Sequence, residues 1–236
     1  MSMKNMKPYR IIEEQYGKEH TAHYIPSPLW IRFLQTYSKH RLQVVSEMLP
    51  KEKVSVLEIG CGDGKFLFEN KNHWKNIVGV DVIATQLLKA KQRHYDCPTR
   101  FIEKDFGRES MSFGDSCFDI CVSIATLQYI YDMDFLFSEI HRVLKKDGLW
   151  IFEVPNIVVF WRRWQFLFGR LPKTSNYINA WDAGTIHYFT CRDLQEFCIR
   201  KGFIVESVKT SGIMSSWRSL WPDMLGADLV FICRKK

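Results

Sequence analysis

The sequence lacks a Cys-x-x-Cys pair, a long uninterrupted apolar run, an internal repeat and a low-complexity segment. Its 7 cysteines have no zinc-binding spacing among themselves or with histidine, so we predict no metal site and expect reduced, buried thiols. The most apolar stretch, residues 157–168, is interrupted by Arg162, Arg163 and Gln165, which argues against a membrane span. The basic N-terminus is not followed by the apolar segment of a signal peptide. These absences predict a cytoplasmic protein.

Positive charge is only in modest excess over negative charge. The chain has 33 Lys and Arg against 26 Asp and Glu, a formal net charge of +7, and part of that excess lies in the terminal residues Arg234, Lys235 and Lys236. We therefore favour a solvated basic surface over a nucleic-acid interface. With 46% hydrophobic and 25% charged residues over 236 positions, the composition predicts one globular domain, or one core domain with a lid.

Strand and helix patterns alternate through the middle of the chain. The expected strands are 54–59, 77–81, 100–103, 118–124 and 149–154, with closing strands at 203–208 and 228–233. The expected helices are 63–70, 84–93, 133–145 and 193–201, the last with Thr190 as its N-cap. This alternation predicts an α/β fold with a doubly wound, Rossmann-like, mostly parallel sheet and helices on both faces.

Two segments stand outside this alternation. Apolar residues follow helical spacing from Leu29 to Leu49, so residues 1–50 are expected to form an N-terminal cap and first helix, and residues 51–236 the main domain. Residues 156–188 are rich in aromatic and basic residues and too long for a plain connection. We expect this insertion to fold over the main domain as a lid.

A glycine-rich turn follows the first strand. Gly60, Gly62 and Gly64 allow a sharp turn and close approach of a ligand, and the following helix N-terminus offers free N–H groups. Asp81 ends the second strand, where a carboxylate can accept hydrogen bonds from two ribose hydroxyls. A dinucleotide-binding fingerprint would need glycine at the position of Lys65. The pattern thus indicates an adenosine-containing ligand other than a nicotinamide dinucleotide.

The spacing of these residues resembles the first motif of class I S-adenosylmethionine-dependent methyltransferases, with Glu58 preceding the three glycines. Further matches follow in register at Asp81, Asp105-Phe106, Phe118-Asp119 and residues 139–148. The chain is most similar to the type 11 small-molecule group, which includes ubiquinone-biosynthesis and MetW-like enzymes. The resemblance implies a seven-stranded sheet with an antiparallel last strand, S-adenosylmethionine as cofactor and S-adenosylhomocysteine as product.

The resemblance also implies a role for each matched residue. Backbone groups of residues 60–64 would meet the methionyl part of the cofactor, Asp81 its ribose and Asp105 its adenine amino group. Val82 and Phe106 would flank the adenine ring, and Ile124 and Ala125 would lie beside the sulfonium. The predicted cofactor-binding residues are Glu58, Gly60, Cys61, Gly62, Gly64, Asp81, Val82, Asp105, Phe106, Ile124 and Ala125.

The methyl acceptor is not encoded in these motifs. The fourth strand is followed by Ala125-Thr126, without the prolines and aromatic residue of enzymes that methylate the amino groups of nucleic-acid bases. We therefore expect a small, hydrophobic or aromatic acceptor, in a pocket formed by Tyr16, Tyr24, Trp164 and Trp181, although these aromatic residues could equally form a second small core. His187 is the candidate general base, because it lies where the insertion returns to the main domain.

Three alternatives remain open from the sequence. The chain could be a non-catalytic accessory protein that keeps the fold, or an RNA-modifying methyltransferase that uses its positive charge. The segment Trp161-Arg162-Arg163-Trp164 also suits peripheral contact with a membrane surface, which we favour less than an acceptor pocket.

Overall fold

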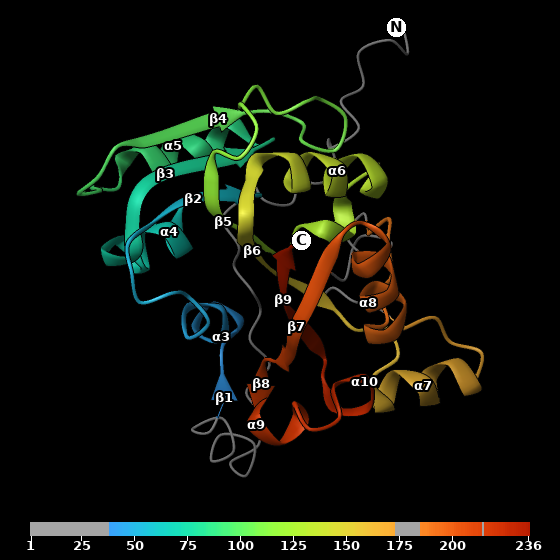
Figure 1. Cartoon of the computed structure of the whole chain (residues 1–236). Helices are drawn as coiled ribbons and strands as arrows, with labels where there is room; N and C mark the ends of the chain where they lie inside the picture. The colour runs from blue at the N-terminus through green and yellow to red at the C-terminus, as the bar shows by residue number, and fades with distance from the viewer. Residues whose placement is uncertain (1–37, 173–184, 214) are drawn as a thin grey trace, which may run out of the picture.

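The computed structural model describes residues 38–172, 185–213 and 215–236. Its centre is a seven-stranded sheet in the order β4-β3-β2-β5-β6-β9-β7 (Figure 1). The strands are β2 Val54–Ile59, β3 Trp74–Asp81, β4 Thr99–Glu103, β5 Phe118–Ile124, β6 Leu144–Pro155, β7 Phe203–Thr210 and β9 Asp228–Lys235. β2 through β6 pair in parallel, and β9 pairs antiparallel with both β6 and β7. The predicted sheet, including its antiparallel last strand, is confirmed.

The sheet separates two apolar cores. In β2, Leu57 packs on one side with α6 (Met133–Val143) and α8 (Cys191–Arg200). Its neighbour Val56 packs on the other side with α3 (Arg41–Ser46), α4 (Lys65–Glu69) and α5 (Ala84–Gln92). Successive side chains of a strand point to opposite faces, and a parallel sheet covered on both faces therefore has nearly continuous apolar strands.

Two of the covering helices begin at side-chain caps. The Thr190 hydroxyl accepts from the Asp193 backbone N–H at 3.1 Å, which confirms the predicted cap of α8. The Asp132 carboxylate accepts from Phe135 N–H at 2.8 Å and starts α6. Both caps satisfy N–H groups that the first helical turn leaves without an intrahelical partner.

The expected helix over residues 29–49 is wrong in its middle. Ser38–Lys39 form a short strand, β1, that pairs antiparallel with β8 (Gly212–Ile213), and α3 starts only at Arg41. His40 has an extended backbone, with φ −65° and ψ 148°, and its Nδ1 accepts from Leu42 N–H. Helical spacing of apolar residues is a local signal, and the strand pairing that overrides it lies about 170 positions away in the chain. Residues 29–37 lie outside the described part.

The insertion after β6 contains a short helix, α7 (Phe160–Leu167), near the lower right of Figure 1. Two further short helices, α9 (Ser215–Arg218) and α10 (Pro222–Leu225), lie between β8 and β9. The Asn156 side-chain amide, at the exit of β6, donates to the carbonyl oxygens of Pro222, Asp223 and Gly226. α10 is thereby tied to the beginning of the insertion. Within the described ranges, no helix has the length and apolarity to cross a membrane.

Candidate functional site

A cavity of about 500 Å³ lies at the carboxyl edge of the parallel strands. This is the edge at which open α/β sheets bind ligands, and the volume lies within the range of small-molecule sites. The wall includes most of the residues predicted to bind a cofactor, namely Glu58, Gly60, Cys61, Gly62, Asp81, Val82, Phe106, Ile124 and Ala125. Gly64 and Asp105, also predicted, do not line it.

The glycine turn after β2 forms one wall because its backbone takes left-handed conformations. Gly60, Gly62 and Gly64 have φ of 73°, 51° and 72°. A Cβ at Gly60 would lie 2.1 Å from the Thr126 hydroxyl oxygen, and one at Gly64 would lie 2.6 Å from the Tyr95 hydroxyl. A Cβ at Gly62 would meet no atom within 4 Å. Glycine at 60 and 64 thus allows close packing behind the turn, while Gly62 faces open space.

Asp81 holds this turn in place. Its Oδ2 accepts from Gly62 N–H at 2.8 Å and its Oδ1 from Ile83 N–H at 2.9 Å. The side chain is 6% exposed. Burial raises the pKa of Asp81, and the N–H groups of Ile83, Gly62 and Val82 limit the rise. A carboxylate has about four acceptor positions, so it retains capacity for a ligand hydroxyl.

Glu58 is a buried acid without a hydrogen-bond partner for its Oε2 among the described residues. It is 3% exposed and lines the cavity beneath the glycine turn. Burial raises its pKa well above the usual range, and the nearby carboxylates of Asp81 and Asp63 raise it further. A buried polar atom left unpaired costs free energy, so this end of the cavity favours a ligand with a hydrogen-bond donor or a positive charge.

The exit of β5, the strand next to β2, forms an adjoining part of the wall. Ala125 has a φ of 52°, and its N–H donates to Glu153 Oε2 at 2.9 Å. Glu153, on β6, is 1% exposed, and burial raises its pKa to about 8, with a smaller contribution from Asp228. The Arg41 guanidinium, at the start of α3, lies 3.9 Å from the same carboxylate. Glu153 thereby connects the β5 exit to the helix on the cavity's outer side.

Sequence reasoning missed Glu153 and the contribution of α3. His40, Arg41 and Leu42 line the cavity, although only the more distal N-terminal residues were expected to close it. Glu153 had a detectable signal, because it is the lone acidic residue in the apolar strand segment 149–154. A carboxylate in such a strand is expected to be buried and paired. No sequence signal pointed to Arg41, because its approach to Glu153 depends on how α3 packs on the sheet.

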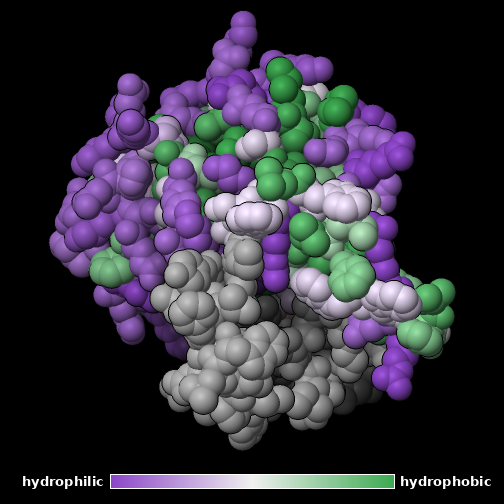
Figure 2. Space-filling model, turned by 90° about the horizontal axis from the view of Figure 1, so that it is seen from below, coloured by the Kyte–Doolittle hydropathy of each residue, from purple (hydrophilic) through white to green (hydrophobic). Residues whose placement is uncertain are grey.

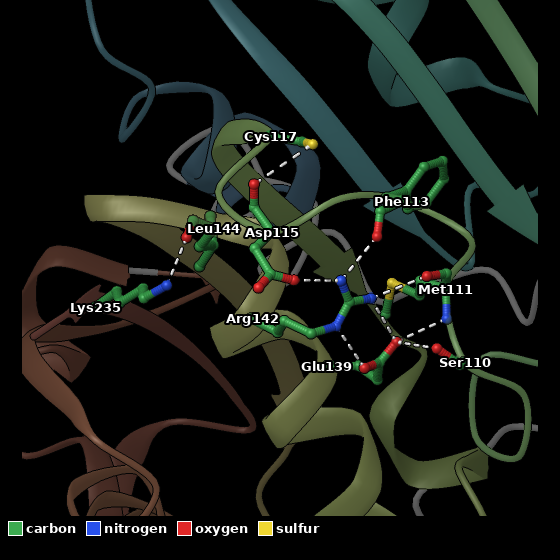
Figure 3. A network of polar contacts seen from close by, with 9 residues as sticks. All are labelled: Ser110, Met111, Phe113, Asp115, Cys117, Glu139, Arg142, Leu144 and Lys235. Atoms are coloured by element: carbon green, nitrogen blue, oxygen red, sulfur yellow. Dashed lines mark hydrogen bonds and ion pairs between the residues drawn. The ribbon is translucent and has the colours of Figure 1, made fainter.

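Phe106 reaches the cavity from the segment between β4 and β5, which a polar network holds against α6 (Figure 3). The Arg142 guanidinium donates to the carbonyls of Met111 and Phe113 at 2.9 and 2.7 Å, and to Glu139. Glu139 in turn accepts from Met111 N–H at 2.7 Å. This network ties the segment that carries Phe106 to a rigid helix.

Asp105 stands at the start of that segment as a turn residue. Its Oδ1 accepts from Gly107 N–H at 3.1 Å, and its Oδ2 lies 3.9 Å from Arg108 Nε. Phe106, the next residue, is 4% exposed and lies in the cavity wall. Of Asp105 and Phe106, therefore, only Phe106 lines the cavity.

Of the four acceptor-pocket residues predicted from the sequence, Trp164 alone lies in the described part of the chain. Trp164 lies on the outer surface of α7, 49% exposed, and does not line the cavity, because α7 projects away from the sheet edge. Tyr16, Tyr24 and Trp181 lie outside the described residues. Trp164 is thus not part of the wall of the cavity at the carboxyl edge of the sheet.

His187 does not line the cavity but is bonded to a residue next to its wall. Its backbone N–H donates to the Gln128 carbonyl at 3.1 Å, and Gln128 is flanked by the cavity residues Thr126 and Tyr129. The buried His187 Nε2 and Gln128 Oε1 have no hydrogen-bond partner in the described part of the chain. In that part, no group of three His, Cys, Asp or Glu residues is arranged to hold a metal ion.

Comparison with known proteins agrees with this geometry. The profile of the family described as "Methyltransferase domain" matches residues 57–152. A malonyl-[acyl-carrier protein] O-methyltransferase of Pectobacterium atrosepticum is 25% identical over 141 residues, 59% of this chain and 54% of that protein. A sterol 4-C-methyltransferase of Caenorhabditis elegans is 27% identical over 146 residues, 60% of this chain and 42% of that protein. The chain therefore spans about half the length of the curated relatives it matches.

A solved structure extends the likeness beyond the matched segment. An S-adenosylmethionine-dependent methyltransferase of Mesorhizobium loti superposes with a TM-score of 0.62 over 81% of this chain and 96% of its own, at 18% identity. That identity shows a shared fold alone. Residues 57–152 thus match the family described as "Methyltransferase domain", and the chain shares the fold of an S-adenosylmethionine-dependent methyltransferase.

Proposed function

We propose that the protein transfers a methyl group from S-adenosylmethionine to a small apolar acceptor, with the cofactor in the cavity at the carboxyl edge of the sheet. The observation that carries the proposal is the buried Glu58 carboxyl in the cavity wall, whose Oε2 has no hydrogen-bond partner among the described residues. Asp81 and Asp63 lie close enough to raise its pKa, so this end of the cavity is acidic. An acidic, glycine-walled cavity fits a ligand that carries a sulfonium and an ammonium group.

Some cavity residues bind the cofactor in this proposal, and others shape the space around it. In the proposal, the backbone of residues 60–64 holds the methionyl part and Asp81 accepts from the ribose hydroxyls. Val82 and Phe106 flank the adenine ring, while Ile124 and Ala125 border the reacting centre. An adenine contact from Asp105 has less support, because its carboxylate is bonded within its own turn and lies off the cavity wall.

The bound cofactor supplies an electrophilic methyl group, and the protein's task is alignment. Displacement at a methyl carbon is in-line, so much of the barrier reduction comes from holding the two reactants in register. Glu153 fixes the position of Ala125 at the β5 exit through the bond to its N–H. Residues of α3 and of the β5 exit line the cavity around the reacting centre.

An apolar acceptor is supported by the side chains around the β5 exit. Leu42, Ile124, Tyr129 and Ile130 line the cavity, next to the polar side chains of His40, Arg41 and Thr126. We propose His187 as the general base for an acceptor hydroxyl, since its Nε2 has no hydrogen-bond partner among the described residues and its segment is bonded to Gln128. One relative's name specifies a sterol, which is an acceptor of apolar character.

Calorimetric titration with S-adenosylhomocysteine tests the cofactor site. We expect the wild-type protein to bind, and Asp81→Asn to bind at least tenfold more weakly because it loses acceptor capacity at the glycine turn and the ribose. Asp119→Asn is the matched control. Asp119 is also a sheet carboxylate that accepts from a backbone N–H, that of Ser55 at 2.8 Å, but it stands at the opposite end of the strands. No binding by the folded wild type would refute the proposal.

Methyl transfer from labelled cofactor to a panel of apolar hydroxyl compounds tests the chemistry. Turnover with any acceptor separates an enzyme from a non-catalytic accessory protein of the same fold. With such an acceptor, His187→Asn is expected to lower kcat by about 100-fold or more while leaving S-adenosylhomocysteine affinity unchanged. An unchanged kcat would remove His187 from the mechanism.

A further inference from the structure

Helix α7 presents its apolar side chains to solvent rather than to the protein. Between Phe160 and Phe168, every large apolar side chain is at least 42% exposed, and no residue of α7 is buried. The side chains are Phe160, Trp161, Trp164, Phe166, Leu167 and Phe168, the last two more than 70% exposed. An ordinary surface helix turns such a stripe toward the core.

Two arginine side chains of α7 are bonded to the chain directly before the helix. The Arg162 guanidinium donates to the Asn156 carbonyl, and Arg163 Nε donates to the Val158 carbonyl at 2.5 Å. Val159, which precedes the helix, is fully buried. The usual arrangement is thus reversed, with two arginines directed at the protein backbone and the aromatic rings left outside.

The apolar surface continues onto the segment around α9. Trp217, Leu220 and Trp221 are 70%, 81% and 58% exposed. The Arg218 guanidinium lies 5.7 Å from the centre of the Trp161 ring, which joins this segment to α7. We call residues 160–171 and 217–221 the aromatic platform. Viewed from below, pale and green side chains gather on the side where α7 lies (Figure 2).

All charged residues of the aromatic platform are positive. Its charged residues are Arg162, Arg163, Arg170 and Arg218, and no Asp or Glu occurs within it; the next acidic residue, Asp223, follows in α10. Tryptophan and arginine together favour the boundary between lipid headgroups and acyl chains. Basic residues near such a surface are attracted to anionic headgroups. Exposed apolar surface of this extent marks a site of interaction.

We infer that the aromatic platform docks the protein on an anionic lipid surface, with the rings of α7 and α9 entering the headgroup region. The arginine–backbone bonds of α7 keep those rings exposed before contact, so docking requires no rearrangement of the helix. This inference is independent of the cofactor site, because no platform residue lines the cavity.

Vesicle flotation of the full chain tests the inference. The probes are vesicles of phosphatidylglycerol and phosphatidylcholine in equal amounts, and vesicles of phosphatidylcholine alone. We expect binding to the anionic vesicles that weakens as salt is raised, and at least fivefold weaker binding to the neutral ones. S-adenosylhomocysteine affinity, measured on the same preparations, reports separately on the proposed function.

Two matched pairs of variants locate the surface. Phe166→Ser, Leu167→Ser and Leu220→Ser combined should weaken anionic-vesicle binding at least tenfold. Leu88→Ser, Ile199→Ser and Ile204→Ser remove exposed apolar residues elsewhere, at 60%, 55% and 46% exposure, and should leave binding unchanged. Arg170→Glu should weaken binding at least fivefold, whereas Lys91→Glu, with the same charge change on α5, should change it less than twofold.

The inference is overturned if the folded wild type floats with neither kind of vesicle. It is also overturned if the platform variants bind as tightly as their controls. A concentration-dependent dimer in the absence of lipid, abolished by the platform triple variant, would identify the surface as a self-association face instead and would equally overturn lipid docking.

Discussion

At Gly60 the backbone takes a left-handed conformation in a space that has no room for a side chain. A Cβ there would lie 2.1 Å from the Thr126 hydroxyl oxygen, which packs behind the turn. We expect Gly60→Ala to cost about 2–4 kcal/mol of unfolding free energy, from backbone strain and overpacking together. Gly169 has a similar φ of 68°, but a Cβ added there would meet no atom within 4 Å. Gly169→Ala should therefore cost only the backbone strain, about 1–2 kcal/mol. Urea denaturation measures both; equal losses would contradict the packing argument.

Glu153 is a buried acid whose pKa is raised to about 8. Below the pKa of the unfolded chain the carboxyl is protonated in both states, and no penalty arises. As pH rises toward 8, ionisation is favoured in the unfolded state only, so stability is lost progressively. Glu153→Gln keeps an acceptor for Ala125 N–H without the charge. We expect it to be more stable than wild type by roughly 1–3 kcal/mol at pH 9, with the difference vanishing near pH 5.

Thermal melts of wild type and Glu153→Gln across this pH range check the prediction. Glu206→Gln, a partly exposed glutamate on β7 that pairs with Arg234, is the control and should show no such gain at high pH. A Glu153→Gln effect that does not grow with pH would mean that the carboxylate is stabilised by Arg41 in the folded protein.

At the scale of elements, the Glu139–Arg142 network joins α6 to the segment that carries Phe106. Hydrogen bonds from Arg142, with contributions from Met111 N–H and Ser110, lower the pKa of Glu139 to about 2. Its contribution to stability is therefore complete above the unfolded pKa and is lost as pH falls toward 2. The network locks two elements that are adjacent in space but about 30 residues apart in the chain.

Glu139→Gln tests this lock. We expect a loss of about 1–3 kcal/mol at pH 7, because a charge-assisted network is broken in a largely buried place, and a smaller loss as pH falls below 4. Glu196→Gln removes an exposed pair with Arg192 on α8 and should cost less than about 0.5 kcal/mol. Urea midpoints from pH 7 down to pH 3 measure both. Equal effects of the two substitutions would show that the network contributes no more than a surface pair.

At the scale of the whole molecule, a ligand held by several strands stabilises all of them together. S-adenosylhomocysteine at about 100 times its Kd should add about 2.7 kcal/mol to the unfolding free energy. For a domain of this size that corresponds to a rise in Tm of about 5–10 °C. Asp81→Asn should lose the rise and Asp119→Asn should keep it, as measured by thermal shift. A rise in Tm that Asp81→Asn retains would place the ligand elsewhere.

Several features of the fold and site follow from local sequence signals. The β-branched runs, the helix caps and the turn at residues 60–64 predict the sheet, its helices and the position of the cavity, because strand ends and glycine turns are set by neighbouring residues. Asp81 was found in the same way, since a carboxylate that ends a parallel strand stands at the ligand-binding edge. Thr190 was likewise predicted to be a helix cap, because it stands directly before an amphipathic helix.

Other features needed the tertiary structure. The interruption at residues 38–40 depends on pairing of β1 with a strand near the C-terminus. The Arg41–Glu153–Ala125 contacts join three elements that only packing brings together. The outward orientation of the α7 aromatics depends on where Arg162 and Arg163 find their carbonyl partners. By itself the sequence determined the fold class and the edge of the sheet at which the cavity lies, since both depend on local patterns. Only the tertiary structure decided which side chains face the cavity and which face solvent, because that follows from long-range packing.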